Sequence, residues 1–353
     1  MSTATRWYTT RESVKAAVGI SGAEKNALLD SYIEAASEGV ERLLESRGNP
    51  RFIPGTETRL YPWPQVAGRS TIVYLKADLL SVTTLQVAAQ DSSPTTIVAA
   101  DYFLEPVNKL PYRRIEIDLS SSSSFVSGDT QQRSISVAGS WGYSNATKAA
   151  GAIGAQFAAS TTATSVVCSD ASLVDVGNTL LIESEQVFVS ERSTVDTAMN
   201  LNDTLVALNN DVTVTVGDGT AVNQGEVILI ESERMLIESI SGNDLTVKRA
   251  VDGSTLAAHS TGKDVYAFRT LTVVRGVNGT TAAVHADTTA VTKYAPPADI
   301  SILCLAETIA LLKQGESGWT GQIGGGDGAV ETRMFNLEQL RERVLENYGE
   351  ITL

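Results

Sequence analysis

The sequence contains few of the residues that carry most catalytic and metal-binding chemistry. Its 353 residues include two cysteines and two histidines, and only 6% are aromatic. Cys168 and Cys304 fall in segments that we assign below to different domains, so we expect neither a disulfide framework nor a thiolate metal site. The aromatic residues of the central region are few and scattered, which argues against the stacking surfaces of sugar-binding proteins.

Positive charge is also scarce. Lys and Arg total 27 against 41 Asp and Glu, which gives a net charge of −14. A protein with this balance should not wrap DNA, because binding to phosphates depends on cationic side chains. The same acidity would suit a channel that DNA passes without adhering, although solubility alone is the simpler explanation.

No hydrophobic run is long enough to span a bilayer. The most apolar segment, Ile300–Leu312, is too short and carries Glu307 in its middle. Nothing in Met1–Tyr8 resembles a signal peptide. We therefore expect a soluble protein, made in the reducing cytoplasm, that has no membrane partner.

Helical patterns occur only at the two ends of the chain. A short helix is predicted over Arg11–Val18, with Thr9 or Thr10 as its N-cap. A longer one over Ala23–Arg47 carries apolar residues at steps of three and four and is ended by Gly48-Asn49-Pro50. Helix returns after Pro296 and is apolar nearly all round, so it should be covered on several sides.

Between these ends the apolar period changes to two, which predicts strands. The serine run Ser120–Ser124 indicates a loop. The strands predicted before residue 150 are Thr58–Tyr61, Thr71–Leu75, Val82–Val87, Tyr102–Pro106, Arg114–Leu119 and Ser134–Trp141.

The central region repeats itself. Thr164–Val189 aligns with Val212–Ile237 at an offset of 48 residues. Leu245–Ser254 matches Leu271–Thr280 at an offset of 26, and this match continues through His259 and His285.

The order of the four pieces is first half, first half, second half, second half. This order fits one β unit nested inside another: Thr164–Ser193 continues at Thr270–Thr292, and its twin is held between. Two parallel halves of one sandwich would give a similar string. A plain tandem duplication would alternate the pieces instead.

The predicted fold class is α+β. Residues 1–150 and 294–315 should form a core of helices with a small antiparallel β part. Residues 151–293 should form an inserted all-β, sandwich-like domain with an internal duplication. Residues 316–353 should form a flexible Gly-rich linker and a C-terminal helix.

The C-terminal helix is the best candidate for a functional element. Asn336 is its predicted N-cap, Gln339 completes a capping box, and Gly349 is the predicted C-cap. An amphipathic helix on a Gly-rich tether suits docking on a partner, although its stripe would equally pack on its own domain. The predicted docking residues are Phe335, Leu337, Leu340, Val344, Leu345 and Tyr348.

No constellation of catalytic or cofactor-binding residues is evident. Gly321–Gly326 lacks the Lys-Ser/Thr pair of a phosphate-binding loop, so a linker is preferred. His259 and His285 occupy equivalent repeat positions without evident carboxylate or thiol companions, which favours a structural role near a turn. We expect no enzymatic activity and no cofactor.

Two pairs of glutamates leave one question of ion binding open. Glu183 with Glu185, and Glu231 with Glu233, should each place two carboxylates on one strand face. Such pairs can bind calcium or act as acid and base, but a half-exposed strand produces the same alternation. We favour the half-exposed strand.

Features of both ends occur in the order found in one known family. They are the helices Arg11–Val18 and Ala23–Arg47, the segment Arg47–Pro54, the strand Tyr102–Pro106, the strand into Gly139–Tyr143 and the helix Pro297–Leu312. These patterns resemble the head–tail connector (adaptor) proteins of tailed bacteriophages. The resemblance covers residues 6–145 and 296–315.

The resemblance implies a structural virion protein rather than an enzyme. Family members form homo-oligomeric rings, commonly dodecamers, in the neck between the portal of the DNA-filled head and the tail, where DNA passes during ejection. It implies a portal partner, a tail-side neck or stopper protein, and C-terminal segments that reach onto the portal or neighbouring subunits. The β insertion departs from the family, whose usual members are much shorter. The rival hypothesis is a carbohydrate- or surface-binding module of tail-fibre or adhesin type with a helical attachment base.

Overall fold

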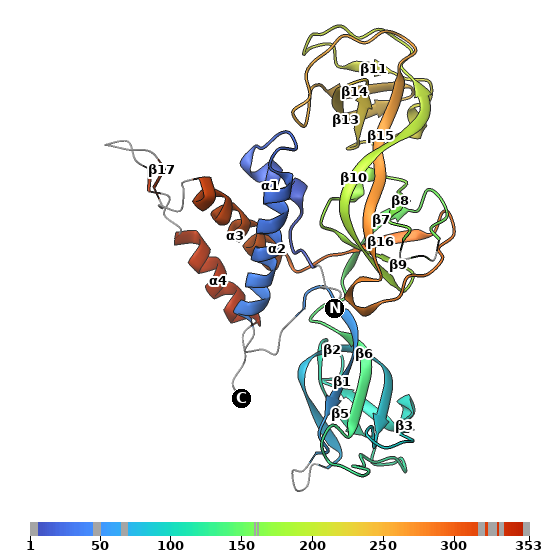
Figure 1. The fold of residues 1–353 in the computed structure, drawn as a ribbon, viewed down its shortest axis with the longest axis vertical. Coiled ribbons are helices and arrows are strands. Elements are labelled where there is room, and N and C mark those ends of the chain that lie inside the picture. The colour runs from blue at the N-terminus through green and yellow to red at the C-terminus, as the bar shows by residue number, and fades with distance from the viewer. Residues whose placement is uncertain are drawn as a thin grey trace.

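The computed structural model describes residues 6–44, 51–64, 70–158, 160, 162–316, 322–323, 330–331 and 335–348. Over these residues the chain forms four α-helices, two large antiparallel sheets and a two-stranded sheet of β17 (Gln322–Ile323) and β18 (Val330–Glu331). Figure 1 shows the helices beside an elongated column made by the two large sheets. This is an α+β organisation with a large β part, as the sequence predicted.

The first two helices form much as predicted. Helix α1 (Arg11–Val18) begins after Thr10, whose side chain accepts a hydrogen bond from the Ser13 amide, and ends at Gly19 in a left-handed conformation with φ 67°. Helix α2 (Asn26–Leu43) buries the apolar stripe that the sequence defines. The predicted terminator Gly48-Asn49-Pro50 lies outside the described residues.

The C-terminal helices join the first two in one layer. Helix α3 (Ala298–Glu316) packs against α1, α2 and α4 (Phe335–Tyr348), so it is covered on several sides. Its exposed side carries Ile302, which is 51% exposed. We call α1–α4 the helical layer. Glu316, the first residue of the predicted linker, is still within α3.

The first large sheet has the order β1-β6-β2-β5-β4, with β3 paired to β2. One prediction was wrong: the two strands expected at 71–75 and 82–87 are one strand, β2. Four consecutive buried residues, from Ala77 to Leu80, interrupt the alternation there because the pairing shifts register. The strands are β1 (Gly55–Tyr61), β2 (Ile72–Val87), β3 (Thr95–Ile97), β4 (Tyr102–Glu105), β5 (Tyr112–Ile117) and β6 (Ile135–Trp141).

The second large sheet has the order β11-β14-β13-β12-β15-β10-β9-β16-β7, with β8 paired to β15. It runs from residue 147 to residue 294. Its strands are β7 (Thr147–Ala152), β8 (Ser165–Val167), β9 (Thr179–Ile182), β10 (Glu185–Asn200), β11 (Thr213–Thr215), β12 (Val227–Ile230), β13 (Glu233–Ser241), β14 (Asp244–Lys248), β15 (Asp264–Arg275) and β16 (Ala290–Tyr294).

The long strands β10 and β15 join two nested units, as the order of the repeats predicted. The first half of β10 pairs with the second half of β15, and the second half of β10 pairs with the first half of β15. We call residues 147–194 and 269–294 the outer module, and residues 195–268 the inner module. Each has its own apolar core, around Val187 and Leu271 in the outer module and around Met235 and Leu245 in the inner one. In Figure 1 the inner module lies at the far end of the β10–β15 ribbon.

Candidate functional site

The stripe of α4 predicted to dock on a partner is packed within the helical layer. Leu337, Val344 and Tyr348 are buried in a core shared with α2 and α3, and Leu340 packs against the same core. The Tyr348 ring meets the rings of Phe52 and Tyr143 edge-on, with centroids 5.3 and 4.9 Å away. The stripe thus packs on its own domain, which is the alternative to docking that the sequence left open.

The remaining side of α4 is polar and largely exposed. Leu345, which is 37% exposed, is the one predicted docking residue of 337–348 that reaches the surface substantially. Around it the helix exposes Glu338, Glu342 and Glu346. The α4 helix begins at Phe335, one residue before the predicted N-cap. The side chains of Phe335 and Asn336, and Gly349, lie outside the described residues, so the capping box and the C-cap do too.

Polar contacts fasten α4 to α3 at two places. Arg341 forms a bidentate ion pair with Glu307, through distances of 2.6 and 2.9 Å. Near the end of α4, the Tyr348 hydroxyl and the Asn347 amide both donate to the Asp299 carboxylate, over 2.8 and 3.1 Å. Any docking by α4 while the layer stays intact must therefore use Leu345 and the exposed polar residues of this helix, which include Arg343 as well as the three glutamates.

A second set of candidate residues, the glutamates and histidines of the repeat, forms one buried ion cluster in each module. In the inner module Glu233 is fully buried and accepts hydrogen bonds from Arg249 Nε and Nη2, both at 2.7 Å. It also accepts from the amides of Ala250 and Ala257 and contacts His259 Nε2 at 2.9 Å. The Glu231 carboxylate contacts the other ring nitrogen, Nδ1, at 2.8 Å.

The outer module repeats this cluster at the equivalent positions. Arg275 binds Glu185 through Nε at 2.9 Å and Nη2 at 2.5 Å. His285 contacts Glu185 through Nε2 at 2.8 Å and Glu183 through Nδ1 at 2.7 Å. One arginine, one histidine and two carboxylates are thus held in the same arrangement in both modules.

Two interpretations of these residues from the sequence were wrong. The glutamate pairs do not share a strand face, because Glu183 and Glu231 stand in two-residue hairpin turns, with φ 54° and 53°. The histidines do have carboxylate companions. Their partners are distant in sequence, 26 to 102 residues away, and strand pairing brings them together.

The clusters look structural rather than ion-binding. In each, the two carboxylates contact opposite nitrogens of one imidazole, so they do not converge on a common point. Over the described residues, no group of three or more His, Cys, Asp or Glu is arranged to hold a metal ion. Each buried glutamate instead meets an arginine, a histidine and backbone amides, which satisfies its oxygens without solvent.

Acid should destabilise the inner module through Glu233. Burial alone would raise the pKa of this carboxyl, but the hydrogen bonds from Arg249, Ala257 and His259 outweigh burial and lower the pKa from 4.5 to about 2. Because the folded pKa lies below the unfolded value, this stabilisation is complete above pH 4.5 and is lost as the pH falls toward 2. We expect the protection of β12–β14 against hydrogen exchange, measured relative to the intrinsic exchange rate at each pH, to fall over that interval.

The control for this prediction is the exposed Glu238 on β13. A Glu238→Gln variant should keep the acid response, whereas Glu233→Gln should remove most of it and exchange faster already at neutral pH. Equal pH dependence in both variants would contradict the assignment.

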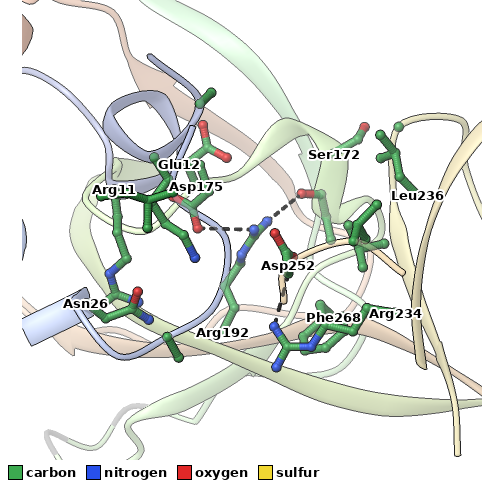
Figure 2. A pocket seen from close by; sticks show the side chains of 18 of the residues that line it. Arg11, Glu12, Asn26, Ser172, Asp175, Arg192, Arg234, Leu236, Asp252 and Phe268 are labelled. Carbon is green, nitrogen blue, oxygen red and sulfur yellow. Dashed lines mark hydrogen bonds and ion pairs between the residues drawn. The ribbon is translucent and has the colours of Figure 1, made fainter. Parts of the chain in front are cut away.

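A cleft of about 510 Å³ lies between α1 and the two modules. On one side, α1 and β10 form two ion pairs. Arg11 binds Glu191 at 2.9 Å, and Arg192 binds Glu12 at 3.1 Å. Burial raises the pKa of Glu12 although Arg192 opposes it. Figure 2 shows Arg192 reaching toward Glu12, while Arg234 and Asp252 face the same space from the inner module.

The repeat contained a signal for part of this site. Arg249 and Arg275 occupy matched positions in the alignment at an offset of 26, yet nothing in the local pattern said that they are buried. The cleft gave no local signal, because its walls come from α1 and from both modules.

Comparisons with known proteins identify no relative. No protein-family model matches the sequence, and neither a curated protein nor a solved structure is significantly similar to it. Among the helices of the described residues, none combines the length and the apolar character needed to cross a membrane.

Proposed function

We propose that the chain is a subunit of a homo-oligomeric ring, of about twelve copies as in the connector family that it resembles, that joins a phage portal to the tail. One observation carries the proposal: α1 and α2 pack with α3 and α4 in a single layer, although about 250 residues separate α2 from α3 in the sequence. The helices that carry the resemblance thus form one body, whose core also contains Phe52 and Tyr143, the residues that flank the first sheet. In this proposal that body is the connector core, and the protein is a structural virion component without catalytic activity.

The charge of the helical layer supports passage of DNA through such a ring. Helix α2 exposes Glu34 and Glu38, and α4 exposes Glu338, Glu342 and Glu346. Carboxylates at a lumen would repel phosphates and allow DNA to slide without adhering. The outer and inner modules would then project away from the axis and contact other neck or capsid proteins, among them the tail-side stopper.

Native mass spectrometry of the purified chain, alone and with purified portal, tests the proposal. We expect a closed ring, or ring formation on the portal, with a mass that is a whole multiple of 37.4 kDa. Electron microscopy of the same sample should place the helical layer at the portal. A monomer that does not bind the portal and instead binds glycans or host-cell envelopes would overturn the proposal in favour of a surface-binding module.

A further inference from the structure

One face of each module can be compared position by position, because the two modules are related by the internal repeat. In the outer module this face consists of five buried residues: Gln186, Phe188, Val277, Asn278 and Tyr294. Their equivalents in the inner module all line the cleft, and none is fully buried. They are Arg234, Leu236, Val251, Asp252 and Phe268, and we call them the inner face.

The outer face is buried because the rest of the chain docks on it. Trp7 packs its ring edge-on against Phe188, with centroids 5.2 Å apart. The preceding Arg6 donates from Nη1 to Asn278 Oδ1 over 2.9 Å. The side-chain amide nitrogen of Gln186, Nε2, also donates to the carbonyl of Pro54 over 2.9 Å. An Arg-Trp pair of residues and a backbone carbonyl thus cover the outer face together with apolar residues of the helices, such as Leu29 and Leu312.

The inner face keeps the same construction, but no part of the chain that the structure describes buries it, and its residues line the cleft instead. The Asn278–Gln186 hydrogen bond of 2.8 Å is replaced by a loose Arg234–Asp252 ion pair of 3.9 Å, with side chains 36% and 43% exposed. The Arg234 guanidinium lies over the Phe268 ring, 4.7 Å from its centroid, where the outer module has Gln186 bonded to Tyr294. These side chains form a half-buried apolar floor with one acidic and one basic group at its edge.

We propose that the inner face is a docking site for a segment of another protein in which a basic residue is followed by an aromatic residue. The outer face shows that this arrangement binds an Arg-Trp pair. On the inner face Asp252 stands where Asn278 accepts from Arg6, so a cation gains a charge-assisted hydrogen bond there. The aromatic ring lies on Leu236 and Val251, the equivalents of Phe188 and Val277.

The size and position of the cleft set what can enter. A volume of about 510 Å³ is that of a small-ligand pocket, so it admits a few side chains of a segment rather than a whole helix. The cleft is closed on one side by the α1–α2 turn, since Gly22 approaches Gly253 closely.

The test uses the full chain and a labelled synthetic peptide of residues 6–18, which begins with Arg6-Trp7. Fluorescence anisotropy should show saturable binding of one peptide per chain. Peptides with Arg6→Glu or Trp7→Ala should bind at least about tenfold more weakly, because each removes one of the two anchors.

Variants of the chain assign the binding to the inner face. Asp252→Arg and Leu236→Asp should each weaken binding at least about tenfold. Lys248→Asp, at an exposed position of β14 outside the cleft, should leave binding unchanged. Circular dichroism and thermal unfolding check that each variant is folded. Asp252→Asn copies the outer module, so it should keep saturable binding of the peptide.

Three outcomes would overturn the proposal. They are absence of saturable peptide binding, binding that Asp252→Arg leaves intact, and self-association of the chain that Asp252→Arg abolishes. The last would assign the face to a second copy of the chain instead. This proposal does not depend on the proposed ring, because every measurement uses the isolated chain.

Discussion

Replacing Arg275 with methionine should destabilise the outer module by about 3–5 kcal/mol, the cost of leaving a buried charge without its partner. Arg275 and Glu185 have side chains that are 1% and 0% exposed. Besides Glu185, the guanidinium donates to the carbonyls of Ala158 and Ala283 and lies over the Phe157 ring, 3.7 Å from its centroid. Methionine would fill part of the space but supply none of these donors.

Hydrogen exchange resolved by strand is the appropriate measurement, because a chain with several cores need not unfold in one step. Amides of β9 and the second half of β15 should lose protection in Arg275→Met. The matched control is Arg249→Met, which should instead affect β12–β14 and leave the outer module protected. Loss of protection throughout both modules in either variant would contradict their separate cores.

A double variant separates the two sources of this effect. Arg275→Met combined with Glu185→Leu removes both charges, so it should recover much of the stability lost in the single variant. No recovery would mean that the hydrogen bonds from Arg275 to the backbone, rather than its pairing with Glu185, dominate.

Local patterns in the sequence predicted the elements that depend on near neighbours. The steps of three and four in α2 predicted its buried stripe, and Thr10 and Gly19 end α1 where cap chemistry places them. The order of the repeat halves predicted the nested units, because each strand pairing involves a run of consecutive residues and the repeat is therefore visible over whole segments. The continuity of β2 was missed, since the register shift within it depends on β5 and β6 and cannot be recognised from the residues of β2 alone.

Contacts between distant segments could not be predicted from the sequence, for a related reason. His285 lies 100 residues from Glu185, and no periodicity connects them. The alignment did show that each histidine recurs with a glutamate pair and an arginine, so shared recurrence was the one available signal. The stripe of α4 was read correctly as amphipathic, but amphipathicity does not say which surface covers the helix.

That ambiguity can be resolved at two adjacent positions of α4. Val344 is 1% exposed, whereas Leu345 is 37% exposed. Val344→Asp should destabilise the helical layer by about 4 kcal/mol or more, because it places an unpaired carboxylate in an apolar core. Thermal unfolding should show the loss of stability. Hydrogen exchange should show lower protection of α2–α4, while the inner module stays protected.

Leu345→Asp should change the stability of the layer by about 0.5 kcal/mol or less, as expected of a surface substitution. Val344→Asp would weaken portal binding whether α4 docks or merely packs, since it disrupts the layer in either case. Leu345→Asp disturbs only the exposed side, so a loss of portal binding in this variant would show that α4 itself docks. Unchanged portal binding by a folded Leu345→Asp protein would confine α4 to packing and leave docking to another surface of the ring.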